Sequence, residues 1–201
     1  RQPGGSTSAQ TQAPTGLMLG TGVRVASTEK SFTQGSLQQT GNALDLAING
    51  RGFFEISLPD GSIAYTRDGA LRLSAEGALV NSAGHPLQPA LSIPDGAQSV
   101  TVGADGTVTV QMPGEATPVT LGTLTLTDFI NPAGLQARGD NLFDETAASG
   151  PPQQGTPGIN GIGSIAQGAL ESSNVNVVEE LVNMIETQRA YEMNSKAISA
   201  T

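Results

Sequence analysis

The sequence predicts a mainly β protein, made of a small all-β domain of barrel or sandwich type, extended flanking segments and one long C-terminal α-helix. Two observations predict the β domain: turn sequences that contain Gly recur about every 7 to 11 residues, and the runs between them are short and rich in apolar or β-branched residues. A third predicts the helix, because residues 173–201 contain neither Gly nor Pro and carry apolar residues at helical spacing. We therefore expect four parts: a polar extended tail and connecting segment (1–40), the β domain (41–140), a return strand and linker (141–170) and the helix (171–201).

Composition narrows the classes of partner. The 201 residues carry a formal net charge of −9, from 18 acidic and 9 basic side chains. Nucleic acids and anionic membranes attract clustered cations, so this balance argues against both as partners. No run approaches the roughly 20 apolar residues that cross a bilayer, and we expect no membrane insertion. The chain has no Cys, which excludes disulfides and thiolate metal sites, and with only 3% aromatic residues its core must be built from Leu, Val and Ile.

The first 16 residues, RQPGGSTSAQTQAPTG, are almost all Gln, Ser, Thr, Gly and Pro. A segment this polar cannot bury enough apolar surface to fold alone, so it is either a disordered leader or a segment that becomes ordered against a partner. Residues 17–40 add isolated apolar positions without a sustained period. We expect extended connections there and one short pair of strands.

The β domain begins where a two-residue period appears. Apolar residues alternate from Leu44 to Ile48, which predicts a strand with one buried face. Asn49-Gly50 then favours a tight hairpin turn, with residues 53–58 as the partner strand. The further turn sequences are Pro59-Asp60-Gly61, Asp68-Gly69, Glu76-Gly77, Ala83-Gly84, Pro94-Asp95-Gly96, Asp105-Gly106 and Pro113-Gly114.

Residues 141–170 contain Pro151-Pro152 and many Gly, so they cannot form a helix. We interpret them as a return strand and extended linker with little to pack, which carries the chain back toward the start of the domain. Both ends of the chain would then lie on the same side of the β domain.

The helix carries the candidate functional surface. Asn176 can cap its first turn, with Glu179 as the reciprocal partner three residues later. At about 25 residues it would be roughly 40 Å long, which exceeds the width of a domain of this size. An intermolecular or missing helical partner is therefore favoured over packing against the chain's own β domain, and the unbroken pattern up to Thr201 suggests a fragment. The predicted assembly stripe consists of Val177, Val178, Leu181, Met184, Ile185, Tyr191 and Ile198.

Catalytic chemistry finds little support. The single histidine, His85, lies in a turn where a solvated surface residue is expected, and no His cluster indicates zinc. Most acidic residues of the β domain stand beside Gly at turns, and no Trp is present to stack on a sugar. Arg67-Asp68 could be a functional pair, although an ion pair that pins a hairpin is favoured. We predict no enzyme activity, no cofactor and no metal site.

Three stretches resemble the bacterial flagellar rod and hook proteins: TGNALDLAINGRGFFEI (40–56), YTRDGALRLSAEGALVNSAGHPL (65–87) and QGALESSNVNVVEELVNMIETQRAYEMNSKAI (167–198). Their order and combination are specific, and they cover much of the chain. The polar segment ahead of Gly20-Thr21-Gly22-Val23 resembles the distal rod members most closely.

The resemblance implies a self-assembling axial protein. Its terminal helices would form a coiled coil in an inner tube, its β domain would face outward, and its polar N-terminal segment would fill gaps between subunits. Helically stacked copies would form a rigid drive shaft from the periplasm to the outer membrane, with other rod and hook proteins at its ends and ring proteins around it. Such proteins are exported by the flagellar type III apparatus. The alternatives are a hook or proximal-rod paralogue and, less favoured, a secreted β-sandwich adhesin or a wall-active enzyme.

Overall fold

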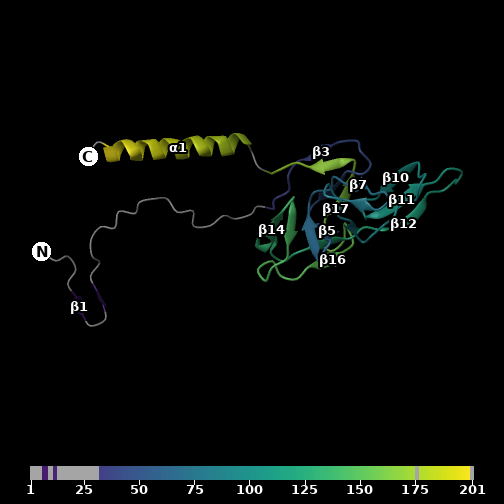
Figure 1. Cartoon of the computed structure of the whole chain (residues 1–201), viewed down its shortest axis with the longest axis horizontal. Helices are drawn as coiled ribbons and strands as arrows, with labels where there is room; N and C mark the ends of the chain where they lie inside the picture. Colours follow the sequence, from purple (N-terminus) through teal and green to yellow (C-terminus); the bar gives the residue numbers. More distant parts are fainter. Residues whose placement is uncertain (1–5, 9–10, 13–31, 175–176, 200–201) are drawn as a thin grey trace. The chain divides into compact units, whose positions relative to one another are not determined.

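The computed structural model describes residues 6–8, 11–12, 32–174 and 177–199 (Figure 1). The chain divides into two units, Arg1–Lys30 and Ser31–Thr201. In the first unit, strand β1 (Ser6–Ser8) pairs antiparallel with β2 (Thr11–Gln12). The remainder of the polar tail, and with it the choice between a disordered and an ordered segment, lies outside the described residues.

The second unit is mainly β and ends in one long helix, as predicted. Its largest sheet has five strands in the order β14-β15-β6-β5-β9. Strands β5 and β6 form the hairpin predicted at Asp60-Gly61, where Gly61 adopts a φ of 82° and the N–H of Leu58 donates to the carbonyl of Ser62 (2.9 Å). The five strands are β5 (Phe54–Ser57), β6 (Ile63–Thr66), β9 (Leu87–Gln88), β14 (Gln136–Gly139) and β15 (Leu142–Asp144).

Smaller sheets complete the β domain. Strands β10, β11 and β12 form a meander whose connections fall at the predicted turns Asp105-Gly106 and Pro113-Gly114. Pairs β7 with β8 and β13 with β16 are also antiparallel, and among the described strands no sheet closes into a barrel. These elements are β7 (Arg72–Leu73), β8 (Leu79–Val80), β10 (Ser99–Val102), β11 (Thr107–Gln111), β12 (Val119–Thr123), β13 (Leu126–Asp128), the 3₁₀ turn η1 (Pro132–Gly134) and β16 (Gln153–Gly155).

The segment 141–170 packs far more than the sequence suggests. Besides β15 and β16, it supplies β17 (Ser164–Gln167), which pairs with β4 (Leu46–Asn49). Ile165 is 3% exposed and belongs to the core. The expectation of little packing was wrong because its few apolar side chains are spaced to point inward from short strands, while the intervening Gly residues allow the chain to bend.

The hairpin predicted at Asn49-Gly50 does not form. Strand β4 pairs with β17, and β5 pairs with β6 and β9, so the two strands belong to different sheets. Gly50 does have a positive φ, 117°, but its backbone lies against Gly163, whose N–H donates to the carbonyl of Arg51 (2.7 Å). The dipeptide therefore turns a corner between sheets, a choice that local turn chemistry cannot specify.

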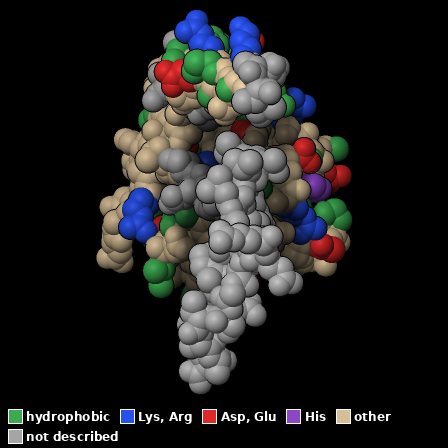
Figure 2. All heavy atoms as spheres, turned by 90° about the vertical axis from the view of Figure 1, so that its left-hand side faces the viewer, with side chains coloured by type: hydrophobic (Ala, Val, Ile, Leu, Met, Phe, Trp, Pro, Cys, Tyr) green, Lys and Arg blue, Asp and Glu red, His purple; other side chains and the backbone are tan. Residues whose placement is uncertain are grey.

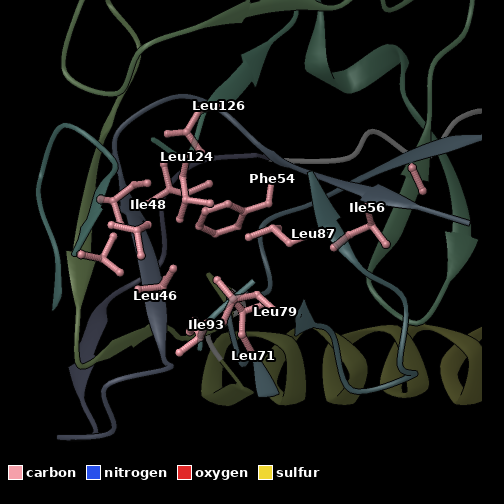
Figure 3. Close-up of a cluster of buried hydrophobic side chains, with 14 of the residues drawn as sticks. Leu46, Ile48, Phe54, Ile56, Leu71, Leu79, Leu87, Ile93, Leu124 and Leu126 are labelled. Carbon is pink, nitrogen blue, oxygen red and sulfur yellow. The ribbon is translucent and has the colours of Figure 1, made fainter. Parts of the chain in front are cut away.

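The main core lies between these sheets. Figure 3 shows Phe54 near its centre, with Leu87 beside its ring and Ile48 and Leu124 nearby. All four side chains are essentially buried. As expected from composition, aliphatic residues dominate this cluster. Apart from Phe54 and Tyr191, the aromatic residues gather in a second cluster, formed by Phe53, Tyr65, Phe129 and Leu135, with Phe32 and Phe143 packed against it.

Helix α1 (Val177–Ser199) follows the β domain (Figure 1). It has 23 residues, close to the predicted length. The proposed cap, Asn176, lies outside the described residues. In the described part of the chain, no helix is long and apolar enough to span a membrane.

Candidate assembly surface

The described side chains of α1, residues 181–197, are all exposed. Four members of the predicted stripe are among them: Leu181 is 52% exposed, Met184 57%, Ile185 49% and Tyr191 78%. The side chains of Val177, Val178 and Ile198 lie outside the description. Figure 2 shows hydrophobic side chains open to solvent among charged ones at the top of the view, where α1 lies. The stripe thus presents apolar surface with nothing of the described chain covering it.

Two further apolar residues of α1 are exposed away from the predicted stripe. Val182 is 49% and Met193 67% exposed. They lie about 100° and about 120° around the helix axis from Leu181, so a single-stripe interpretation omits them. The sequence did offer a sign of them, because α1 has more apolar residues than one face can hold. Such a surplus is typical of a helix that contacts more than one neighbour.

The segment that leads into the β domain (the incoming segment) pairs with the segment that leaves it toward α1 (the outgoing segment). Strand β3 (Leu37–Gln39) and β18 (Ala169–Glu171) are antiparallel, and beyond them the N–H of Ser172 donates to the carbonyl of Ser36 (2.8 Å). The Asn174 amide extends the contact by donating to the carbonyl of Thr33 (2.9 Å). We call these two paired segments, 33–39 and 169–174, the junction. Helix α1 begins three residues after it.

The sequence favoured an ion pair between Arg67 and Asp68, and that prediction was wrong. Arg67 reaches into the junction instead. Its Nε donates to Oε2 of Glu171 at 2.7 Å, and both side chains are largely buried, 16% and 11% exposed. Asp68 instead accepts from the backbone N–H of Ala70, which shapes the local turn. The partner was missed because it lies 104 positions along the chain.

Phe32 anchors the start of the junction to the aromatic cluster. Its ring meets those of Phe53 and Phe143 edge to face, with centroids 5.5 Å and 5.1 Å away. A hollow of about 430 Å³ lies beside it, lined in part by Arg67 and Glu171. Those two charged groups are already satisfied by each other and by backbone, so the hollow offers no free charge for a ligand from them.

The carboxylates at the turns have structural roles. Asp60 accepts from the hydroxyl and the backbone N–H of Ser62, and these bonds hold the pKa of Asp60 below its ordinary value. Asp105 is similar, because hydrogen bonds from Thr107 lower the pKa of its carboxyl group. Among the described residues, no group of three or more acidic, His or Cys side chains could hold a metal ion.

His85 differs from the solvated residue that its turn predicts. It is only partly exposed, and its Nδ1 is buried without a hydrogen-bond partner. Its backbone N–H donates to Oδ1 of Asn81 (2.9 Å), which closes the turn after β8. Among the described hydrogen bonds, none joins the His85 ring to a carboxylate, the partner that orients a catalytic histidine.

Comparison with known families defines the class of protein to which this architecture belongs. The family described as flagellar hook protein FlgE/F/G D1 domain matches residues 47–110, and the family described as flagellar basal body rod FlgEFG protein C-terminal matches residues 166–201. The first match lies in the β domain, and the second includes β18 and α1. The class is therefore that of the structural rod and hook proteins of the bacterial flagellum.

Individual relatives narrow the class further. The chain is 52% identical to the flagellar basal-body rod protein FlgG of Buchnera aphidicola subsp. Schizaphis graminum, over 100% of this chain and 77% of the relative. It is 45% identical to FlgG of Borreliella burgdorferi, over 95% of this chain and 73% of the relative. Identity to the rod protein FlgF of Caulobacter vibrioides is lower, 36% over 94% of this chain and 71% of the relative. The chain belongs to the FlgG family of flagellar basal-body rod proteins, and it is a structural protein and not an enzyme.

Proposed function

We propose that this structural subunit of the flagellar rod forms the distal rod by helical self-assembly, and that α1 supplies the contact between copies. The observation that carries the proposal is the exposed apolar stripe of α1, on a chain whose β domain already has a complete core. Side chains of this size gain roughly 2 kcal/mol each when fully buried. Four of them left open on one helix face favour a helical partner.

The spacing of the stripe fits a bundle of helices. Leu181, Met184 and Tyr191 lie three and seven residues apart, which keeps one seam facing a partner helix. Gln188 continues the seam as a polar position. A polar residue at such a position specifies register at some cost in stability, which suits an assembly in which every copy must adopt the same offset.

The rod family assembles with other rod and hook components, and this chain shares that role. We propose in addition that the distal rod runs from the periplasm to the outer membrane and that ring proteins surround it. Export by the flagellar type III apparatus is part of the same proposal. The β domain faces outward in this arrangement, and torque passes along the stacked helices to the hook.

A charge placed on the stripe tests the proposal. The double variant Leu181→Asp/Ile185→Asp, introduced into the natural gene, is expected to abolish rod assembly and swimming because it would bury two carboxylates without partners. Basal bodies would be isolated and viewed by electron microscopy, and swimming would be scored in soft agar. The matched control, Asn183→Asp/Ala190→Asp, adds the same number of charges on the opposite, exposed face of α1.

The folded state of the β domain must be intact in both variants for the comparison to count. Thermal unfolding of the purified chains is expected to give the same transition as the parent, because neither pair touches the core. Rods of normal length and number in the stripe variant would contradict the proposal. Loss of rods in both variants would show that added negative charge, and not the stripe, is responsible.

A further inference from the structure

The junction is where any load must pass between the helix and the β domain. Strands β3 and β18 are only three residues long, and two of the three residues of β3 are exposed, so their pairing alone would open readily. A shaft whose subunits carry torque needs this point to be stiff. The side chains that meet there are therefore of interest.

Arg67 binds the corner of the β domain through both of its Nη atoms. Its Nη1 donates to the carbonyls of Gly50 (3.1 Å) and Gly52 (2.8 Å), and its Nη2 donates to the carbonyl of Ile48 (3.3 Å). The guanidinium also stands 6.0 Å from the centre of the Phe53 ring. One planar group thus holds the end of β4 and the turn that leads to β5, which a lysine could not do.

Glu171 links Arg67 to the junction. Its Oε2 accepts from Arg67 and its Oε1 accepts from the backbone N–H of Gly35 at 2.8 Å. Glu171 belongs to the outgoing strand β18 and Gly35 to the incoming segment, so this carboxylate joins both to the corner. Gly35 is required at that place because a Cβ there would lie 1.8 Å from the carbonyl oxygen of Ser172.

We propose that Arg67 and Glu171 form a clasp that locks the incoming and outgoing segments together onto the β domain, so that load reaches the domain through both segments at once. The role in carrying load rests on the proposed function, whereas the clasp itself is a property of the single chain. It also assigns a role to the sequence YTRDG, in which Arg67 is the functional member and Asp68 serves the turn. The clasp residues are positioning residues.

Burial of the two charges is the physical reason that losing either clasp residue should be costly. Both groups are largely buried, and removing one partner leaves the other charged and poorly solvated. The exposed pair between Arg138 and Asp60, with side chains 42% and 56% exposed, has no such penalty. Arg138→Gln is therefore the matched control.

Hydrogen exchange of the purified chain tests the clasp. In Glu171→Ala, the amides of Gly35 and Ser172 are expected to exchange at least about tenfold faster than in the parent, while those of Ile56 and Ala64 in the β5–β6 pair keep their rates. Arg67→Lys retains the positive charge but loses the planar set of N–H donors, and we expect a smaller acceleration of exchange at the same two amides. Arg138→Gln should change neither group of amides.

Two results would overturn the clasp. One is unchanged exchange at Gly35 and Ser172 in Glu171→Ala. The other is uniform acceleration that includes Ile56 and Ala64 in both Glu171→Ala and Arg67→Lys, since the pair would then support the whole domain and not the junction. If Glu171→Ala does not fold, Arg67→Lys decides between these outcomes.

Swimming under load tests the mechanical role separately. With the natural gene carrying Arg67→Lys, rods are expected to assemble, and swimming speed in viscous medium should fall several-fold relative to Arg138→Gln. Equal speeds for the two variants would refute the load-bearing role. If the parent gene itself builds no rods, the proposed function fails, while the exchange result on the clasp still stands.

Discussion

The β domain and helix α1 treat the same kind of side chain in opposite ways. Leu46 in β4 is 1% exposed and belongs to a core that the domain closes by itself, whereas Leu181 in α1 is 52% exposed. A β domain of this kind can be stable alone, because its apolar surface is already buried. An isolated helix of 23 residues is only marginally stable in water, so α1 depends on what covers it. The difference teaches that folding and assembly use separate sets of residues here.

Matched Leu→Ala substitutions give the largest expected contrast. Leu46→Ala should lower the free energy of unfolding of the β domain by roughly 3–5 kcal/mol, because it leaves a cavity in a packed core. Leu181→Ala should change the same quantity by less than about 0.5 kcal/mol, because its side chain lies outside that core. Urea unfolding followed by fluorescence of the domain's tyrosine measures both. A comparable loss in the two variants would show that α1 packs on the β domain.

Close backbone approach is expected to make Gly69 nearly as sensitive as the core. A Cβ at Gly69 would stand 1.6 Å from the carbonyl oxygen of Leu46, so Gly69→Ala should cost about 3 kcal/mol or more as the backbone moves apart. Gly84→Ala meets no atom within 4 Å, and its only cost is the positive φ of 87°, about 1 kcal/mol. Thermal unfolding of the two variants checks the order. Equal costs would mean that the backbone at Gly69 moves aside easily, so that crowding does not dominate there.

The tyrosines allow a pH test of the same comparison. Burial raises the pKa of Tyr65 to about 12 from its ordinary value of 10.0, with the charges of Glu55 and Glu145 adding to the effect. The folded state therefore keeps a proton that the unfolded state loses, so the contribution of Tyr65 to stability is constant below pH 10 and falls as pH rises from 10 toward 12, by up to about 2 kcal/mol.

Urea unfolding at a series of alkaline pH values measures this decline. Tyr65→Phe should remove most of it, and Tyr191→Phe, on the exposed helix, should leave it in place. A decline that survives in Tyr65→Phe would assign it to other groups.

The smallest expected effect concerns the helix alone. Ala190→Gly should lower the helicity of α1 by an amount that corresponds to about 1 kcal/mol, because Gly loses more backbone freedom in a helix. The unfolding transition of the β domain should not move. Circular dichroism separates the two signals, since the helix melts gradually and the domain cooperatively. A shift of the unfolding transition of the β domain in Ala190→Gly would show that α1 and the β domain are not energetically independent.

Local residue patterns determined much of the protein. Gly61, Gly106 and Gly114 mark real turns with positive φ, because only the absence of a Cβ makes those conformations inexpensive. The run from residue 177 to 199 is helical, as its lack of Gly and Pro predicts. The apolar stripe was visible for the same reason, since helical spacing is a local property. Its role as an assembly surface stays a prediction.

Tertiary structure alone decided which strands pair and which charges meet. Asn49-Gly50 has the chemistry of a hairpin turn, yet β4 pairs with β17, which lies more than a hundred residues further along the chain. Arg67 has an acidic neighbour in Asp68, yet it binds Glu171, because the fold brings that carboxylate to it and removes both from water. Backbone preferences are decided within a few residues, whereas pairing and burial depend on segments distant in sequence, and only the folded chain brings those together.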